Sequence, residues 1–175
     1  PSNPYSASKA AQEMISIAYW STYKVPVIIT NSNNIVGPNQ DKEKYMAKLI
    51  DLIGRGEEVQ VHTSNGQPGK RYYNPVQNVG NVLNFILERE WKCLDRPWRF
   101  NLPGGEELDN LELAKLVAES LGKELHYRLV DVTSIRPGYD EYYAKTEGTL
   151  GLLGWKPIIS LRDALPDIIR SYTEQ

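Results

Sequence analysis

The stretch at residues 25–30 (VPVIIT) limits the possible folds of this 175-residue chain more than any other feature. A continuous run of β-branched and apolar residues is typical of a strand that is buried on both faces within a parallel sheet. Residues 7–23, just before it, carry an apolar stripe at helical spacing, and Pro4 suits the first turn of such a helix. A helix that leads into a buried strand is half of a βαβ repeat. The sequence therefore predicts an α/β protein built on a parallel sheet.

Further elements are predicted from hydrophobic spacing and from the glycine and proline residues that stop them. The predicted helices cover residues 42–53, 79–89, 110–121, 145–153 and 161–172, with Asn110 as an N-cap. The predicted strands cover residues 59–63, 70–73, 98–102 and 125–130. Asn65 and Gly66 mark a loop between the first two of these strands. Because no repeat or flexible linker interrupts the series, one continuous α/β unit is expected.

Composition narrows the classes of partner. With 20 basic and 22 acidic residues, the net charge of -2 gives no support for nucleic-acid or membrane partners. Cys93 is the single cysteine and cannot form an internal disulfide, so a cytoplasmic protein is expected. Its neighbours include nothing that would activate a thiol, and we interpret it as a packing residue. His62 and His126 are the only histidines and lie far apart in the sequence, which argues against a His/Cys zinc site.

The first candidate for chemistry is a tyrosine and a lysine one helical turn apart. Of the eleven tyrosines, only Tyr5 has a lysine, Lys9, four residues later. Residues at this spacing lie on the same face of a helix, where an ammonium group favours the phenolate and helps it exchange a proton with a hydroxyl or carbonyl group. The spacing alone has little specificity, because an ordinary exposed helix face produces it as well.

The residues around this pair resemble a known family. Residues 3–13 (NPYSASKAAQE) are similar to the extended short-chain dehydrogenase/reductases and, within them, to nucleotide-sugar 4,6-dehydratases such as the dTDP-glucose 4,6-dehydratases. Further similarities follow in the family's order at residues 34–38 (NIVGP), 43–44 (EK), 100–105 (FNLPGG), 136–140 (RPGYD) and 153–157 (LGWKP). Ordered matches over nearly the whole chain argue against coincidence.

The resemblance implies a fold and its division into domains. The chain would be the C-terminal part of a Rossmann-type NAD-binding fold with a smaller α/β substrate domain. Residues 1–40 would close the Rossmann-type domain, and residues 41–175 would form mainly the nucleotide-sugar domain, with residues 71–100 returning to the Rossmann sheet. The glycine-rich phosphate loop and the Asp-Glu pair for dehydration would lie before Pro1, so the chain is expected to be a fragment that is inactive alone. A homodimer is expected from the family.

The resemblance also implies roles in catalysis and cofactor binding. Tyr5 would be the active-site base, and Lys9 would bind the nicotinamide ribose of NAD beside it. Ser32 and Asn34 would lie near the nicotinamide, at the carboxyl end of a strand where α/β folds place their ligands.

A nucleotide-diphosphate sugar is the implied substrate. Arg71 and Arg136 would bind its diphosphate, because guanidinium groups match phosphate oxygens in pairs. Further candidates for this pocket are Asn34, Glu43, Lys44, His62, Asn78 and Tyr139. The family usually has Asp at position 78 and His at position 139, so the contacts to the nucleotide are expected to differ. Pro75 is expected to interrupt a strand ladder.

Two alternatives remain open at this stage. A nucleotide-sugar epimerase or decarboxylase of the same superfamily would share Tyr5, Lys9 and the fold. A non-catalytic nucleotide-sugar-binding fragment would keep the arginines without turnover.

Overall fold

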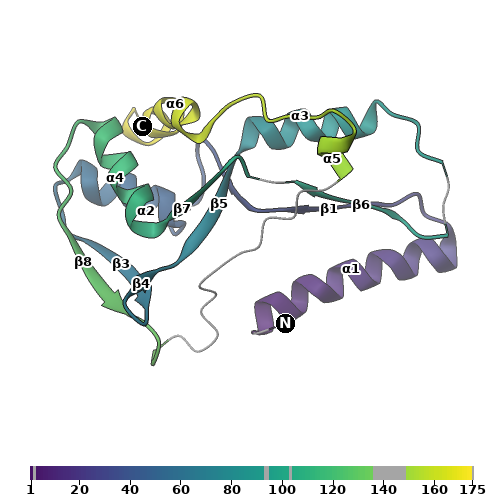
Figure 1. Cartoon of the computed structure of the whole chain (residues 1–175), viewed down its shortest axis with the longest axis horizontal. Coiled ribbons are helices and arrows are strands. Elements are labelled where there is room, and N and C mark those ends of the chain that lie inside the picture. The colour runs from purple at the N-terminus through teal and green to yellow at the C-terminus, as the bar shows by residue number, and fades with distance from the viewer. Residues whose placement is uncertain (2, 93–94, 103, 136–148, 175) are drawn as a thin grey trace.

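The computed structural model describes residues 1, 3–92, 95–102, 104–135 and 149–174. A long helix and a two-stranded sheet lie at one end of the molecule, and three helices with a three-stranded sheet lie at the other (Figure 1). A second three-stranded sheet lies between them. The predicted α/β class is confirmed. None of the described helices is both long and apolar enough to cross a lipid bilayer.

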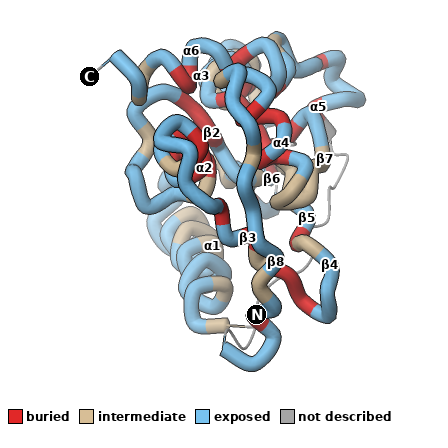
Figure 2. The backbone as a smooth tube through the Cα atoms, turned by 90° about the vertical axis from the view of Figure 1, so that its left-hand side faces the viewer, coloured by how far each residue is buried: buried red, intermediate tan, exposed pale blue. Residues whose placement is uncertain are grey.

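Helix α1 (Pro4–Tyr23) begins where the sequence predicted. The Asn3 side chain accepts a hydrogen bond from the backbone N–H of Ser6, and the Ser6 hydroxyl accepts one from the backbone N–H of Asn3. Lys24 ends the helix in the left-handed conformation. No residue of α1 is buried, and Figure 2 shows the helix in the colours of exposed and intermediate residues only. The apolar stripe predicted on this helix therefore lies at or near the surface.

Strand β1 (Ile28–Ser32) corrects the prediction of a strand at residues 25–30 that is buried on both faces. It is parallel to β6 (Trp98–Leu102), with Ile28 opposite Trp98, so the predicted parallel pairing is present. Its residues are half-buried or exposed. The physical reason is that, within the described part of the chain, β6 is the one strand that pairs with β1.

The second sheet has the order β2-β5-β7. Its strands are β2 (Asn34–Val36), β5 (Lys70–Pro75) and β7 (Glu106–Asp109). The pairing of β2 with β5 is parallel and that of β5 with β7 is antiparallel. Pro75 lies opposite Val36 as the last residue of β5 and directly precedes helix α3, so it ends the strand and does not interrupt the ladder as predicted. Sequence analysis predicted no strand at the residues of β2 or β7.

The third sheet has the order β4-β3-β8. Strand β3 (Val59–Ser64) is parallel to β8 (Tyr127–Asp131) and forms a hairpin with β4 (Gln67–Pro68). Asn65 and Gly66 both have positive φ angles, 50° and 77°, as a tight two-residue hairpin turn requires. The turn predicted at this dipeptide is confirmed.

Local hydrogen bonds explain one shifted helix start and one shifted N-cap. Helix α2 (Tyr45–Gly54) begins three residues later than predicted, because Asp41 accepts backbone hydrogen bonds from residues 43 and 44 and closes a turn first. Helix α4 (Asn110–Leu121) is capped by Asp109 and not by Asn110. The Asp109 carboxylate accepts from the backbone of residues 111 and 112, while the Glu112 side chain accepts from the backbone of Asp109.

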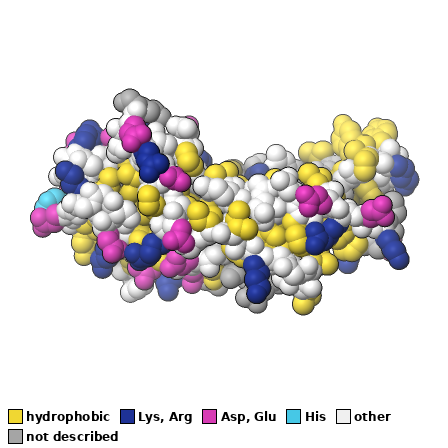
Figure 3. All heavy atoms as spheres, turned by 90° about the horizontal axis from the view of Figure 1, so that it is seen from above, with side chains coloured by type: hydrophobic (Ala, Val, Ile, Leu, Met, Phe, Trp, Pro, Cys, Tyr) yellow, Lys and Arg dark blue, Asp and Glu magenta, His cyan; other side chains and the backbone are white. Residues whose placement is uncertain are grey.

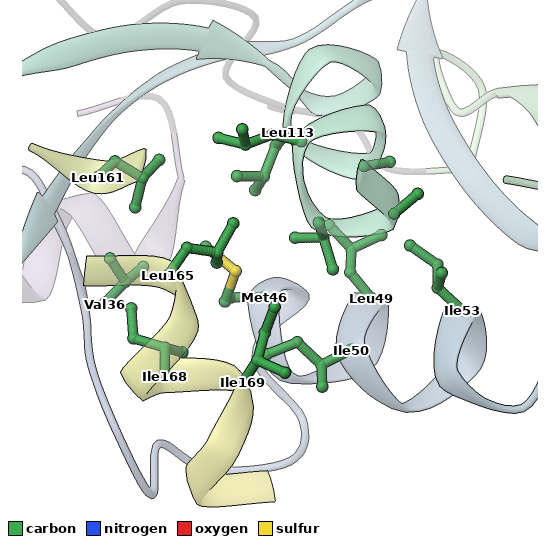
Figure 4. Close-up of a cluster of buried hydrophobic side chains, with 14 of the residues drawn as sticks. Val36, Met46, Leu49, Ile50, Ile53, Leu113, Leu161, Leu165, Ile168 and Ile169 are labelled. Atoms are coloured by element: carbon green, nitrogen blue, oxygen red, sulfur yellow. The ribbon is translucent and has the colours of Figure 1, made fainter. Parts of the chain in front are cut away.

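The larger core lies among α2, α4 and α6 (Leu161–Thr173), as the close-up in Figure 4 shows. Leu165 of α6 is fully buried there beside Met46 of α2. One face of the second sheet adds Val36 and Tyr73 to this cluster, and β3 adds Val59. The core thus fixes β2 and β5 against the three helices.

A smaller core lies under helix α3 (Val76–Leu87), which begins three residues earlier than predicted. Val82 and Ile86 of α3 pack with Phe100 of β6 and with Leu150 of the short helix α5 (Thr149–Leu152). Residues 145–148 of the helix predicted at 145–153 lie outside the described residues. This cluster ties the β1–β6 sheet to α3.

Candidate functional site

Tyr5 and Lys9 lie on the first two turns of α1, whose start is fixed by the Asn3 cap. The Tyr5 side chain is exposed, at 71%. The Lys9 ammonium nitrogen Nζ donates to Oε1 of Gln12 at 2.7 Å. Helical spacing therefore gives the two groups a common side of the helix, while the ammonium group is held by a neutral amide further along it.

Ser32 and Asn34 lie at the carboxyl end of β1 and at the start of β2, and both are exposed. Ser32 pairs with Leu102, so the two parallel strands β1 and β6 end at the same edge. Ligands of α/β folds bind at such an edge. The structure places these two predicted residues where a cofactor or substrate can reach them.

Arg71 lies on the sheet face that carries Asn34. Asn34 pairs with Tyr73 of β5, and Arg71 precedes Tyr73 by two residues, so strand alternation gives all three the same face. The Arg71 guanidinium donates to the carbonyl oxygen of Lys70 at 2.7 Å. Arg136 and Tyr139 were also predicted to contact the nucleotide. Both belong to the motif at residues 136–140 and lie outside the described residues.

Three further candidates are spread over separate elements. Glu43 and Lys44 are exposed in the turn before α2, where Glu43 forms an ion pair with Lys48 at 2.8 Å. His62 is half-buried in β3, opposite Val130 of β8. The third sheet thus carries His62, while Asn34 and Arg71 belong to the second.

Asn78 serves the protein's own backbone. Its side chain is 0% exposed in the first turns of α3. Its carbonyl oxygen accepts from the backbone N–H groups of Ile158 and Ile159 at 2.8 and 3.1 Å, and its amide nitrogen donates to the Ile159 carbonyl at 2.9 Å. This geometry assigns Asn78 to holding the segment before α6 and does not favour the predicted contact with a nucleotide.

Sequence analysis did not single out the residues that hold α1 and its lysine. Glu13 of α1 forms an ion pair with Arg99 of β6. Gln12 is the acceptor for Lys9. The signal for Glu13 was its position four residues after Lys9, on the same helix face. Arg99 gave no signal, because its partner is distant in the sequence.

The loop after β2 is tied to the C-terminal helix. The Tyr172 hydroxyl donates to the carbonyl oxygen of Gln40 at 2.6 Å, and the backbone N–H of Asn39 donates to the Ser171 hydroxyl at 3.1 Å. Burial raises the pKa of the Tyr172 phenol. An open cavity of about 390 Å³ lies at this junction, between residues 39–42 and Tyr172.

Comparisons of the sequence and of the fold with known proteins point to one family. The sequence profile of GDP-mannose 4,6 dehydratase matches residues 1–168. The chain belongs to this dehydratase family. It is 30% identical over 179 residues to human dTDP-D-glucose 4,6-dehydratase, with 99% of this chain and 49% of the relative covered. The resemblance inferred from residues 3–13 and the later motifs is thereby confirmed.

Solved structures of dehydratases and epimerases have the same fold as this chain. The dTDP-glucose 4,6-dehydratase of Streptomyces venezuelae is 29% identical, with a TM-score of 0.84 over 99% of this chain and 52% of that chain. The UDP-glucose 4-epimerase of Thermus thermophilus is 24% identical, with a TM-score of 0.84 over 98% and 54%. Both were solved with NAD bound. The dehydratase family member described here spans about half the length of these proteins, and its TM-scores confirm the predicted Rossmann-type α/β fold.

Proposed function

We propose that this chain is the active-site-tyrosine and substrate half of an NAD-dependent nucleotide-sugar 4,6-dehydratase. The observation that carries the proposal is the placement of Tyr5 and Lys9 on the capped start of α1 together with Ser32 and Asn34 at the carboxyl end of β1. Family membership over residues 1–168 supports it.

The described residues fit the nicotinamide end of NAD. Tyr5 is exposed, Lys9 offers an ammonium group that pairs with no carboxylate in the described part of the chain, and Ser32 lies at the carboxyl end of β1. They do not supply a pyrophosphate cradle, because the glycines at 54 and 56 end helix α2 and do not open one. We therefore propose that residues beyond this chain complete the cofactor site.

In the proposed reaction, the Tyr5 phenolate oxygen takes the proton of the sugar 4-hydroxyl. Held by Lys9 and Ser32, NAD would supply reversible hydride-acceptor chemistry, at the sugar C4 before water is lost across C5 and C6 and at C6 afterwards. Lys9 stabilises the phenolate and binds the nicotinamide ribose. Arg71, with Arg136, binds the diphosphate of the sugar nucleotide. The acid and base for the loss of water are expected outside this chain, so the chain alone is expected to leave the substrate unconverted.

The test is a thermal-shift titration of the purified chain with NAD, dTDP, UDP, GDP and CDP. A ligand at about 100 times its Kd stabilises the folded state by about 2.7 kcal/mol, or roughly 5 to 11 °C for a chain of this size. We expect one nucleoside diphosphate to give this shift and NAD to give none. Arg71→Gln should abolish the shift. Arg128→Gln is the matched control, because Arg128 also lies on a strand but pairs with Glu58 in the third sheet. A chain that no nucleoside diphosphate stabilises contradicts the proposal.

The products of turnover distinguish the proposed dehydratase from an epimerase and from a non-catalytic binding fragment. Production of a 4-keto-6-deoxy sugar by the chain alone would contradict the proposed division of labour, and a sugar inverted at C4 would indicate an epimerase. Tyr5→Phe should leave nucleotide binding intact. If the longer protein turns over and Tyr5→Phe leaves its rate unchanged, Tyr5 is not the base.

A cytoplasmic homodimer is also part of the proposal. The dimer is supported by the exposed apolar surface of α1, which includes Met14, Ile15, Tyr19 and Tyr23. Hydrophobic side chains gather at the end of the molecule where α1 and α3 terminate (Figure 3). Light scattering of the purified chain tests this part, since a monomer at micromolar concentration contradicts it.

A further inference from the structure

Glu13 connects the helix of the reactive pair to the neighbouring sheet. It lies on the side of α1 that also carries the half-buried Ile17 and Trp20, and its side chain is only 19% exposed. Its carboxylate forms an ion pair with the guanidinium group of Arg99. Arg99 stands opposite Ile29 in the β1–β6 ladder, so the pair joins the helix to this sheet.

The same carboxylate is a natural partner of Lys9. Glu13 follows Lys9 by four residues, and residues at this spacing are neighbours on a helix surface. An ammonium group gains more from a carboxylate than from a neutral amide. Lys9 nevertheless donates to the Gln12 amide at 2.7 Å. The carboxylate within its reach is taken by Arg99.

We propose that Arg99 is a positioning residue that holds Glu13 away from Lys9. Its guanidinium group is more weakly hydrated than an ammonium group, which favours it as the partner of this largely buried carboxylate. The order lysine then glutamate is also the weaker arrangement of an i,i+4 pair, so Arg99 wins the competition. Within the ranges that the structure describes, no carboxylate therefore offsets the charge of Lys9, which remains available to the Tyr5 phenolate and to an incoming ligand. This inference rests on the roles proposed above for Tyr5 and Lys9.

The pairing can be measured directly by NMR of the lysine ammonium groups in the 175-residue chain. Lys9→Arg identifies the Lys9 signal by its loss. In the parent chain, we expect Lys9 to show a contact with the Gln12 side chain and none with the Glu13 carboxylate. In Arg99→Gln, the Lys9 signal should shift and gain a contact with Glu13, with the new pair favoured about twofold over the unpaired form.

Further substitutions distinguish this role from simple anchoring of α1 to the β1–β6 sheet. Glu13→Gln alone should leave the Lys9 signal unchanged, and the double variant Glu13→Gln with Arg99→Gln should return it to the parent position. Arg99→Lys should keep the parent signal in part. Arg128→Gln, which breaks the ion pair with Glu58 elsewhere, should leave Lys9 unaffected.

The outcomes are distinct. If the three variants Arg99→Gln, Glu13→Gln and their combination shift the Lys9 signal alike, the ion pair only anchors α1 and the proposal is overturned. It is also overturned if Lys9 already contacts Glu13 in the parent chain. Because no nucleotide or cofactor enters this experiment, its failure is distinguishable from a failed thermal-shift titration, which bears on the proposed function alone.

Discussion

Replacing Asn74 with leucine is expected to stabilise the protein. Asn74 is 0% exposed in β5, opposite Ile35 of β2. Neither its amide nitrogen nor its carbonyl oxygen has a hydrogen-bond partner among the described residues. A buried polar group without a partner costs about 1–3 kcal/mol, and leucine has nearly the same shape without that cost. For a chain of this size, the gain corresponds to a rise in Tm of roughly 2 to 12 °C.

Asn78 is the matched control, because it is equally buried, in α3, and its side chain is hydrogen-bonded. Asn78→Leu removes three hydrogen bonds to the backbone of Ile158 and Ile159 and leaves two N–H groups without an acceptor. We expect a loss of about 2–5 kcal/mol. The two substitutions, identical in chemistry, should therefore change stability in opposite directions.

Thermal and urea unfolding followed by circular dichroism measure both effects. The urea midpoint should rise for Asn74→Leu and fall for Asn78→Leu, while the slope m stays constant. An unchanged or lower Tm for Asn74→Leu would refute the reasoning, because it would mean that the amide of Asn74 is satisfied in solution.

Three further predictions concern stability. Gly104→Ala should destabilise the protein by about 1–3 kcal/mol, because a Cβ there would lie 2.9 Å from a backbone oxygen of β5. The Cβ of Gly105→Ala would meet no atom within 4 Å, so this control should be neutral. Urea midpoints test both variants. Leu165→Ala should cost about 2–5 kcal/mol because Leu165 is fully buried, while Leu152→Ala, at an exposed position, should change the unfolding free energy by less than about 0.5 kcal/mol. Hydrogen bonds from the side chain and backbone of Thr133 lower the pKa of Asp131 below its usual 3.8. The contribution of Asp131 to stability is therefore present above pH 3.8 and is lost as the pH falls through the pKa of the folded state. Asp131→Asn should therefore weaken the acid dependence of Tm below about pH 4, and an unchanged pH profile would contradict this assignment.

Local signals predicted much of the fold. The bounds of β6 and the start of α1 follow from hydrophobic pattern and capping, and Asn65-Gly66 gives the hairpin turn. Strands β2 and β7 could not be found in this way, because they are short, lack alternation and exist through pairing with β5. The prediction that β1 is buried on both faces was wrong for a related reason. Burial depends on neighbouring elements that the strand's own sequence does not specify.

The candidate site shows the same difference between what local sequence signals predict and what tertiary contacts decide. Motif resemblance predicted roles for Tyr5, Lys9, Ser32 and Asn34, and these roles stay predictions; Ser32 is exposed at the carboxyl end of β1, and Asn34 is exposed at the start of β2. It did not reveal that Asn78 binds backbone or that Arg99 holds Glu13, because both contacts join segments far apart in the chain. Spacing can report which groups share a helix face, but competition for one carboxylate is settled by tertiary structure.

The connectivity of the sheets sets the order in which this chain can fold. Ile28 pairs with Trp98, and Val59 pairs with Tyr127, whereas the β3–β4 hairpin joins close neighbours. Pairings between distant segments carry a large loop-closure entropy and slow folding to the millisecond-to-second range. As the chain leaves the ribosome, α1 and the hairpin can form early, but β1 must wait for β6. During that interval the edge of β1 that pairs with β6 is open, and unpaired strand edges of this kind favour aggregation.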